Sequence, residues 1–460
     1  MTRLARWAAA IIVFILLAYV GVCIVLDLAE RDVVFADISE PLSDQLPAGF
    51  LWGTATSAHQ VEGGNVANDW ARFEAEPGRT PSGAAADHWN RVAEDIALMR
   101  DIDANAYRFS VEWSRVEPTE GVWDETAWAH YQSEVAQLRA AGIEPMATLL
   151  HFTLPAWLAE RGGLTALDFP SLFGNFAAES ARRLGADVNL WCTLNEPNVQ
   201  MYQGYVEGIW PPGERNTTSA AEAFAGLVRG HAAASLALRE FDPGSQIGVA
   251  MSLIVFDPAS RWSLLDWIAA KQAGGGFNWA FYDSIKEGRI QLGLVGFPKL
   301  DYPLPELKGS ADFLGINYYR RNMVDFSWGA PGLVSILPGP GRLSDTGVEV
   351  YPEGLLRLMR QAWKSYGLPI YVTENGVADS AGVIRPDFIR SHAHAIGLAL
   401  SEGIPVQGYF HWSLLDNFEW TAAFGPRFGL YHVDRTTMER RPAAGAAEFA
   451  RLAPHKQPSQ

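Results

Sequence analysis

The sequence predicts a parallel (β/α)8 barrel, or TIM barrel, and three observations lead to this fold class. Eight short apolar segments typical of strands alternate with stretches that have the amphipathic period of helices, which is the pattern of a parallel sheet. Two of these segments are followed by a glutamate, Glu196 and Glu374, and the carboxyl ends of barrel strands point into the mouth of the barrel. A chain of 460 residues without an internal repeat is long enough for one such barrel, and no second domain is expected after it.

The first element along the chain is an apolar segment over residues 7–26, which Arg3 and Arg6 precede. About 20 residues of helix are enough to cross the hydrocarbon core of a membrane. The competing interpretation is a cleavable signal peptide, but the segment is longer than a typical signal core and no small-x-small cleavage site follows it. Lipidation of Cys23 is not expected, because a hydrophobic residue stands where a lipoprotein signal needs a small one. We therefore expect one uncleaved transmembrane helix over residues 1–28, with a cleaved, secreted form as the less favoured alternative.

The charges around this segment predict its orientation in the membrane. Basic residues precede it, and the acidic residues Asp27, Glu30 and Asp32 follow it. This distribution places the N-terminus in the cytoplasm and the rest of the chain outside, in a periplasmic or extracellular space. A linker over residues 29–46 is expected to connect the helix to a barrel domain over residues 47–453, and residues 454–460 are expected to form a flexible tail.

The barrel strands and helices are expected where the hydrophobic period changes along the chain. The predicted strands lie at residues 51–54, 104–110, 145–151, 190–194, 247–252, 313–318, 370–373 and 406–412, and the clearest helices at 89–101, 128–141, 176–184 and 353–366. A segment rich in glycine and proline over residues 328–346 follows the sixth strand and would overhang the mouth of the barrel. Gly274, Gly275 and Gly276 are expected to form a flexible turn, and not a phosphate-binding loop, because no strand–loop–helix context with a lysine follows.

Composition excludes some partners and leaves others open. A net charge of −16 argues against nucleic acid, which requires a basic surface. The 17 tryptophans suit both core packing and platforms on which sugar rings stack. A disulfide between Cys23, in the apolar N-terminal segment, and Cys192, in a barrel strand, is not expected. No metal, no cofactor and no obligate protein partner is expected.

The two strand-end glutamates are the strongest indication of chemistry. Either residue alone would fit a structural salt bridge or a helix cap. Together they fit the cleavage of a glycosidic bond, which needs one protonated carboxylic acid and one ionised carboxylate. Arg108, within another predicted strand, would hold one of the two carboxylates ionised through a charge-assisted hydrogen bond. The sequence therefore indicates a glycosidase site at the mouth of the barrel.

Seven motifs resemble, in the same order along the chain, those of family 1 glycoside hydrolases, the retaining β-glucosidase and β-galactosidase family. The resemblance extends from about residue 47 to residue 451, which is nearly the whole predicted barrel domain. The motifs are Phe50-Leu51-Trp52-Gly53-Thr54-Ala55-Thr56-Ser57 with Gln60, Tyr107-Arg108-Phe109-Ser110, Leu150-His151-Phe152-Thr153-Leu154-Pro155, Asn195-Glu196-Pro197, Gly315-Ile316-Asn317-Tyr318-Tyr319, Thr373-Glu374-Asn375-Gly376 and Trp412-Ser413-Leu414-Leu415-Asp416-Asn417-Phe418-Glu419-Trp420.

The resemblance implies a role for each matching position. Glu196 would be the acid/base and Glu374 the nucleophile of a double displacement with retention. Arg108 and Tyr319 would bind the nucleophile, and Asn195 would bind the sugar 2-hydroxyl. The remaining sugar-binding residues would be Gln60, His151, Asn317, Trp412, Glu419, Trp420 and Phe428.

Some positions bear on the substrate. As a carboxylate, Glu419 would accept hydrogen bonds from a neutral hexoside and would repel a 6-phosphate, and a glutamate at position 196, where thioglucosidases of the family have glutamine, argues for ordinary O-glycosides. His59, Phe152 and residues 66–70 depart from the family's usual residues, so the acceptor and aglycone specificity stay open. The expected partner is a small-molecule β-glycoside, which could be an oligosaccharide, an aryl or alkyl glycoside, or a glycolipid.

Three functions are compatible with these residues. The leading hypothesis is a membrane-tethered β-glucosidase that hydrolyses terminal β-D-hexosides and that could also accept β-galactosides and β-fucosides. The second is a membrane-associated transglycosylase that moves a hexosyl group to a sugar or glycolipid acceptor; it resembles the galactolipid galactosyltransferase of plant chloroplast envelopes, which also combines an N-terminal hydrophobic segment with this barrel. The third is an inactive sugar-binding protein, which the presence of both glutamates with Arg108, Asn195 and Tyr319 disfavours.

Overall fold

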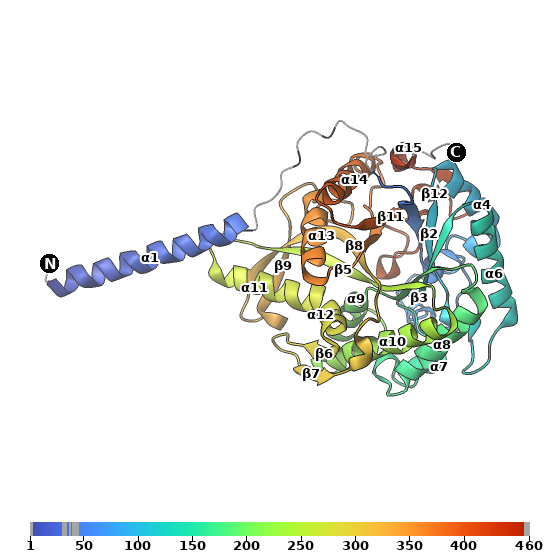
Figure 1. Ribbon diagram of the computed structural model, residues 1–460, viewed down its shortest axis with the longest axis horizontal. Coiled ribbons are helices and arrows are strands. Elements are labelled where there is room, and N and C mark those ends of the chain that lie inside the picture. Colours follow the sequence, from blue (N-terminus) through green and yellow to red (C-terminus); the bar gives the residue numbers. More distant parts are fainter. Residues whose placement is uncertain (1–2, 30–34, 36–37, 39–45, 455–460) are drawn as a thin grey trace.

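The computed structural model describes residues 3–29, 35, 38 and 46–454 (Figure 1). A long N-terminal helix, α1 (Arg3–Ala29), projects from one side of a barrel domain. Most of the expected linker over residues 29–46, and nearly all of the expected tail over residues 454–460, lie outside the described residues.

Eight parallel strands close the barrel. They follow one another in the order β1, β2, β3, β4, β5, β8, β10 and β11, and β11 pairs with β1 to complete the ring. Each strand overlaps one of the eight segments that the sequence predicts, so the TIM barrel is confirmed. The strands are β1 (Leu51–Ala55), β2 (Ala106–Ser110), β3 (Glu144–Leu150), β4 (Leu190–Asn195), β5 (Gln246–Pro258), β8 (Phe313–Phe326), β10 (Ile370–Asn375) and β11 (Val406–Trp412).

The strands are buried on both faces, as expected for a parallel barrel covered by helices. Every residue of β2, β4 and β10 is buried. Close strand packing requires a small residue at Gly53 in β1, where an added Cβ would lie 2.4 Å from the carbonyl oxygen of Ala106 in β2. Side chains such as Met146, Cys192 and Phe313 pack together in one apolar cluster contributed by several barrel strands. Because side chains fill the barrel, its chemistry is confined to the ends of the strands.

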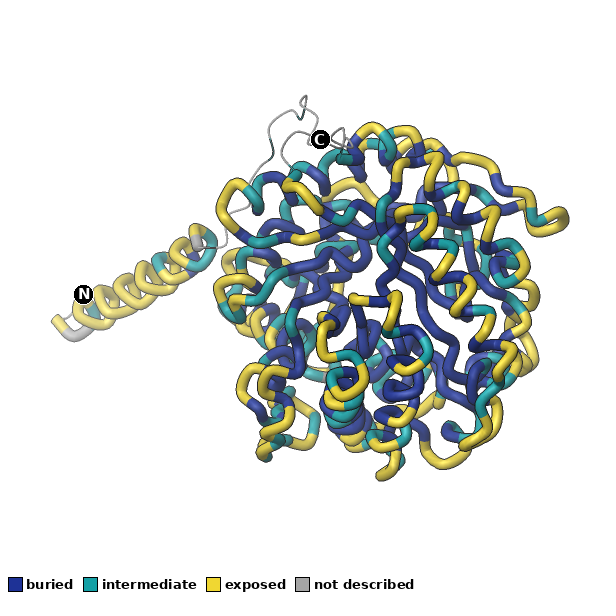
Figure 2. The backbone as a smooth tube through the Cα atoms, turned by 45° about the vertical axis from the view of Figure 1, so that its right-hand side comes forward, coloured by how far each residue is buried: buried dark blue, intermediate teal, exposed yellow. Residues whose placement is uncertain are grey.

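Helices surround the strands, so that the buried residues lie inside and the exposed residues outside (Figure 2). The four predicted helices correspond to α4, α6, α8 and α13, of which α6 and α8 begin earlier than predicted. The Asp124 side chain accepts hydrogen bonds from the first backbone amides of α6, and Pro170 stands in the first turn of α8. The helices are α2 (Ala58–Val61), α3 (Asp69–Glu74), α4 (His88–Asp101), α5 (Trp113–Val116), α6 (Glu125–Ala140), α7 (Ala156–Ala159), α8 (Phe169–Leu184), α9 (Pro197–Met201), α10 (Thr217–Phe241), α11 (Leu264–Gly274), α12 (Ala280–Glu287), α13 (Pro352–Tyr366), α14 (Arg385–Ser401) and α15 (Ala444–Leu452).

Shorter strands lie outside the barrel. The segment over residues 328–346 contains β9 (Val334–Pro338), which pairs antiparallel with the extended second half of β8. Ser344 and Thr346, at the end of this segment, line the cavity at the barrel mouth. Two further antiparallel pairs are formed by β6 (Arg289–Leu292) with β7 (Leu300–Pro303), and by β12 (Tyr431–Val433) with β13 (Arg440–Pro442).

The prediction of a flexible turn at the three consecutive glycines is wrong. Gly274 is the last residue of α11, and Gly275 begins a π-helical turn, η4 (Gly275–Trp279), that continues into α12. The physical reason is packing. An added Cβ at Gly276 would lie 1.9 Å from Leu294 Cδ2, so this glycine allows a close approach within a helical segment.

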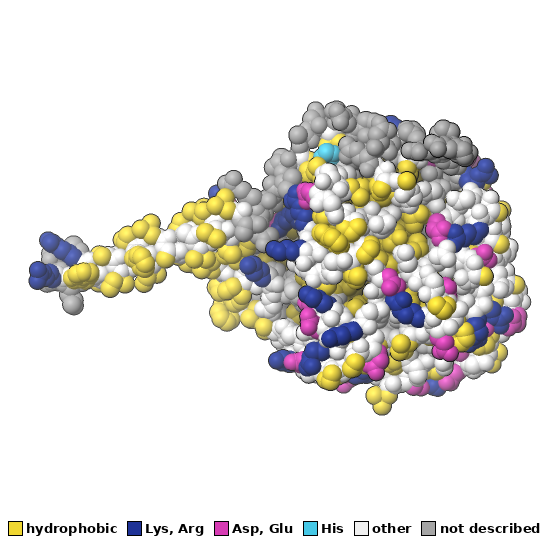
Figure 3. Space-filling model, viewed as in Figure 1, with side chains coloured by type: hydrophobic (Ala, Val, Ile, Leu, Met, Phe, Trp, Pro, Cys, Tyr) yellow, Lys and Arg dark blue, Asp and Glu magenta, His cyan; other side chains and the backbone are white. Residues whose placement is uncertain are grey.

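Helix α1 is apolar over the 24 residues Ala5–Leu28, and an 18-residue stretch within this segment has a mean hydropathy of 3.1. Its length and composition would let it cross a membrane, and a signal sequence passes the same test. The C-terminal part of α1 contacts the domain just before α11: the Tyr19 hydroxyl donates to the carbonyl oxygen of Trp262 at 2.7 Å, and Asp27 lies 3.7 Å from Arg261. The rest of α1 projects from the domain with its apolar side chains exposed (Figure 3).

Candidate active site

A cavity of about 220 Å³ opens at the carboxyl ends of the barrel strands. Ten of the twelve predicted site residues line it, and the other two, Arg108 and Asn317, reach these residues through hydrogen bonds. The structure therefore brings together every residue that the sequence places in the site. The ten lining residues are Gln60, His151, Asn195, Glu196, Tyr319, Glu374, Trp412, Glu419, Trp420 and Phe428.

Glu374, in β10, lies between a cation and a hydroxyl group. Arg108 Nη1 donates to its Oε1 at 2.5 Å, and the Tyr319 hydroxyl donates to its Oε2 at 2.7 Å. Arg108 is 0% exposed and Glu374 is 4% exposed, and a charge-assisted hydrogen bond in so dry a place favours the ionised carboxylate. Burial and the charge of Glu374 raise the pKa of Tyr319 well above its ordinary value, so this hydroxyl keeps its proton and remains a donor.

Glu196, directly after β4, has a different environment. Asn317 Nδ2 donates to its Oε1 at 3.0 Å. Burial, followed by the negative charge of Glu374, raises the pKa of Glu196, and the hydrogen bonds from Asn317 and Ser252 oppose this rise only in part. Glu196 is therefore set to hold a proton, whereas Glu374 is bonded to a buried cation. Glycosidic bond cleavage needs two such carboxyl groups, one that donates a proton and one that acts as a carboxylate.

The backbone at Glu196 is left-handed, with φ of 43° and ψ of 56°. Pro197 disfavours the right-handed helical conformation of the residue before it, and it begins α9 at a position where proline suits a helix. Two other lining residues, Phe152 and Trp420, also have positive φ, of 72° and 53°. Strained backbone of this kind persists where the surrounding packing fixes the direction of a side chain.

The hydrogen bonds of Asn195 determine the tautomer of His151. Arg108 Nη2 and Asn317 Nδ2 can only donate, and both donate to Asn195 Oδ1, at 2.7 and 3.0 Å. Asn195 Nδ2 therefore faces His151 Nε2, 3.0 Å away, which must accept. Burial and then the charge of Arg108 lower the pKa of His151 well below its ordinary value, so the ring is neutral with its hydrogen on Nδ1. Among the described residues this buried Nδ1 has no hydrogen-bond partner, which leaves it available to a ligand.

Glu419, Gln60 and Trp412 form another polar part of the cavity. Trp412 Nε1 donates to Glu419 Oε1 at 3.2 Å, and Gln60 Nε2 donates to the carbonyl oxygen of Phe418 at 2.8 Å. Desolvation raises the pKa of Glu419 to about 8, and the charge of Glu374 adds to this effect while the hydrogen bond from Trp412 opposes it. Burial therefore favours the protonated form of Glu419 in the sugar-free site.

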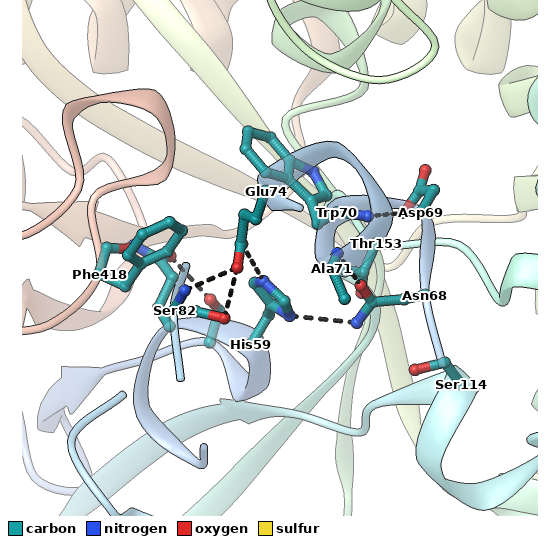
Figure 4. A network of polar contacts seen from close by, with 12 residues as sticks. His59, Asn68, Asp69, Trp70, Ala71, Glu74, Ser82, Ser114, Thr153 and Phe418 are labelled. Atoms are coloured by element: carbon teal, nitrogen blue, oxygen red, sulfur yellow. Dashed lines mark hydrogen bonds and ion pairs between the residues drawn. The ribbon is translucent and has the colours of Figure 1, made fainter. Parts of the chain in front are cut away.

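His59 and Asn68 belong to a buried polar network (Figure 4). Both lie at positions where the sequence departs from the family's usual residues. Asn68 Oδ1 accepts from the Ala71 amide, so Asn68 Nδ2 donates to His59 Nδ1 at 3.1 Å. His59 Nε2 then donates to Glu74 Oε1 at 2.7 Å. The His59 ring stacks on Trp420 with an interplanar angle of 9°. His59, held in place by Asn68 and Glu74, therefore packs behind Trp420, an aromatic residue that lines the cavity.

Three polar residues of the site are missed by reasoning from the sequence. Thr373 Oγ1 donates to Asn317 Oδ1 at 2.6 Å, which turns Asn317 Nδ2 toward Glu196. Ser252, in β5, contacts Glu196, and Arg320, in β8, lines the cavity. Ser252 and Thr373 each end a predicted strand, so the strand-end rule that identifies Glu196 would have found both.

A barrel mouth with one carboxyl group kept protonated by burial and one carboxylate paired with arginine defines an O-glycosyl hydrolase. Residues 42–457 match the family model "Glycosyl hydrolase family 1". The chain belongs to glycosyl hydrolase family 1, and the resemblance seen in the seven motifs is confirmed.

Individual relatives agree with this assignment. The chain is 32% identical over 424 residues to "Beta-glucosidase A" of Thermotoga maritima, with 86% of this chain and 95% of the relative covered. It is 30% identical over 486 residues to "Beta-galactosidase" of Pyrococcus woesei, with 86% and 94% covered. Among solved structures, the β-glycosidase from Pyrococcus horikoshii superimposes with a TM-score of 0.83 at 36% identity and covers 90% of this chain and 96% of that chain.

Proposed function

We propose that the protein is a retaining β-glucosidase that removes terminal β-D-hexosyl groups from small-molecule glycosides. The contrast between the two carboxyl groups carries this conclusion: Glu196 is buried with no cation bonded to it among the described residues, and Glu374 is paired with Arg108. Relatives named β-glucosidase and β-galactosidase support a neutral hexoside as substrate. Neither the site nor these relatives offers an observation in favour of the transglycosylase alternative.

In the first chemical step, a Glu374 oxygen forms a bond to the anomeric carbon while the bond from that carbon to the leaving oxygen breaks. Glu196 gives its proton to the leaving oxygen, so the aglycone departs as an alcohol. Arg108 and Tyr319 hold the unreacted Glu374 charged and oriented. Asn195, which Arg108 positions, is placed to bind the sugar 2-hydroxyl as positive charge develops at the anomeric centre.

The second step depends on the loss of a charge. Once Glu374 is esterified, its negative charge no longer raises the pKa of Glu196, and Glu196 becomes the base that takes a proton from water. The oxygen of that water bonds to the anomeric carbon, the ester bond to Glu374 breaks, and the sugar leaves with its original configuration.

Sugar recognition is proposed to use the remaining polar atoms of the cavity. His151 Nδ1 would donate to a sugar hydroxyl, and Glu419 with Gln60 would bind other hydroxyls over the Trp412 ring. Of the described residues that line the cavity, Arg320 is the one with a cationic side chain, and it borders a second cavity. A 6-phosphate would therefore be disfavoured by the scarcity of cations, even where Glu419 is uncharged.

We further propose that α1 anchors the protein in a membrane, with the N-terminus in the cytoplasm and the barrel outside. The exposed apolar surface of α1 and the basic residues Arg3 and Arg6 in its first turn support this topology. Membranes from producing cells would be washed with alkaline carbonate and the intact mass of the retained chain measured. Retention with residues 1–28 present is expected, whereas a shortened chain in the soluble fraction would contradict the anchor. Proteolysis of the barrel in intact spheroplasts would test the orientation.

Hydrolysis of p-nitrophenyl β-glucoside and β-galactoside by the full-length protein tests the enzymatic function. Turnover is expected for the wild type and not for Glu374→Gln, and the ratio of the two kcat/KM values identifies the preferred sugar. NMR of the first-formed product should show the β-anomer, because two displacements restore the configuration. A first-formed α-anomer would contradict the double displacement.

A further inference from the structure

A second cavity, of about 300 Å³, adjoins the candidate active site. Four residues line both cavities: Val199, Ser252, Ile254 and Arg320. Ser252 also contacts Glu196, so the two cavities meet beside the carboxyl group that would protonate the leaving oxygen. In the proposed mechanism, the aglycone of a bound glycoside would extend away from the sugar at this junction of the two cavities.

The second cavity is apolar. Arg320 is the one charged side chain among the described residues that line it. Its walls come from α9, the short π-helical turn η3 (Tyr202–Val206), β5, α11, η4, residues 293–297 and the β8–β9 hairpin. Aromatic and aliphatic side chains form most of these walls, and the uncharged polar side chains of Gln203, Ser252, Gln272 and Asn322 also contribute. The principal apolar residues of the walls are Phe256, Phe277, Leu294, Phe297, Val334 and Ile336. A hydrocarbon chain would exchange water for these surfaces at a gain in free energy.

Arg320 lies where the apolar cavity begins. Desolvation lowers the pKa of its guanidinium, and the charge of Glu196 opposes this effect. No hydrogen bond or ion pair holds this guanidinium within the described part of the chain. It is therefore free to donate to oxygen atoms in the part of an aglycone next to the sugar.

The outer rim of the cavity lies on the side of the domain that α1 contacts. Val295 and Ile336 line the cavity and are 46% and 45% exposed. Further exposed apolar side chains lie on α11 and β9, at Leu265, Ile268 and Leu337. Hydrophobic side chains gather below the base of α1 in the space-filling view (Figure 3). An apolar rim next to an apolar helix suits a ligand that partitions into a lipid surface.

From this arrangement, and on the basis of the proposed function, we infer that the protein acts on amphiphilic β-glycosides. The sugar would occupy the cavity at the barrel mouth, the oxygen-bearing linkage would lie against Arg320, and a hydrocarbon chain would fill the second cavity toward Val295 and Ile336. The hydrolysis itself would be the one already described, with an alcohol that carries the hydrocarbon chain as the leaving group.

Binding of non-hydrolysable ligands tests this inference separately from catalysis. The full-length protein, held in amphipol so that no detergent competes, would be titrated calorimetrically with ethyl, hexyl and octyl 1-thio-β-D-glucosides below their micelle concentrations. Each buried methylene group is worth up to about fourfold in affinity. The octyl compound is therefore expected to bind at least tenfold more tightly than the ethyl compound.

A double variant, Val295→Asp with Ile336→Asp, places charge on the rim of the second cavity and should reduce the octyl-to-ethyl affinity ratio to below threefold. The matched control is Val383→Asp, which adds a charge at a valine that is 61% exposed and lines neither cavity; it should keep the wild-type ratio. Equal affinities in the wild type, or an unchanged ratio in the double variant, would overturn the inference. Loss of the proposed function would show instead as a failure to hydrolyse p-nitrophenyl glycosides.

Discussion

Arg108 Nη1 lies 2.5 Å from Glu374 Oε1, and the side chain of Arg108 is fully buried. The same guanidinium donates through Nη2 to Asn195, the residue before Glu196. One side chain from β2 therefore connects groups on β4 and β10. It stabilises the charge of one carboxyl group and orients the amide beside the other.

Replacement of Arg108 by methionine should remove this connection. We expect kcat/KM for p-nitrophenyl β-glucoside to fall at least about 100-fold, because a buried carboxylate loses its stabilising cation. Stability should fall by about 3–5 kcal/mol, since one partner of a buried ion pair remains uncompensated. The matched control is Arg289→Met, which breaks an exposed pair with Asp301 and should change stability by about 0–1 kcal/mol. An Arg108→Met enzyme within tenfold of wild type would contradict the role of Arg108.

Glu196→Gln should act selectively on substrates whose leaving group needs a proton. General acid catalysis contributes about 100- to 10,000-fold, so hydrolysis of methyl β-glucoside should fall within that range. The first step with 2,4-dinitrophenyl β-glucoside should be much less affected, because this leaving group departs without protonation, and a burst of dinitrophenol should precede slow turnover. Stopped-flow absorbance measures the burst, with Glu222→Gln on the surface of α10 as the control. Equal losses with both substrates would speak against Glu196 as the acid.

Glu419→Gln should change how stability depends on pH. The pKa of Glu419 is about 8 in the folded state, whereas the ordinary value of 4.5 applies to the unfolded state. Between pH 4.5 and pH 8 the folded state therefore holds a proton that the unfolded state has lost. Folding stability from this group is therefore lost progressively as pH rises from about 4.5 through 8. Glutamine cannot ionise, so the Tm of the variant minus that of wild type should become more positive between pH 5 and pH 8. Calorimetry at several pH values measures this difference; a constant difference would refute the raised pKa.

Glu74→Ala should weaken the network behind Trp420. The Glu74 carboxylate accepts from the His59 ring and from the backbone and hydroxyl of Ser82, so its removal leaves buried donors unpaired. We expect a loss of about 1–3 kcal/mol in unfolding free energy, measured by urea titration. KM for p-nitrophenyl β-glucoside should also rise, because the His59 ring that supports Trp420 loses its partner. Glu76→Ala, which removes only an exposed pair with Arg79, should leave KM at the wild-type value.

The architecture could be predicted from local patterns. Strands buried on both faces need continuous apolar segments, and these recur eight times between residues 51 and 412. The strand ends then identify Glu196 and Glu374, because parallel strands in a barrel present their carboxyl ends at one mouth. Local pattern was insufficient at Gly276, where a close approach to Leu294 within a helical segment, and not a turn, accounts for the glycine.

The chemical state of the site was decided only by tertiary structure. Sequence alone determined that two glutamates, an arginine and their neighbours end at one barrel mouth. It did not determine that burial raises the pKa of Glu419, that Asn195 leaves His151 Nδ1 as a donor, or that an apolar cavity begins at Arg320. The physical reason is that pKa values, tautomers and cavities depend on desolvation and on contacts between strands far apart in the chain, which no local pattern records.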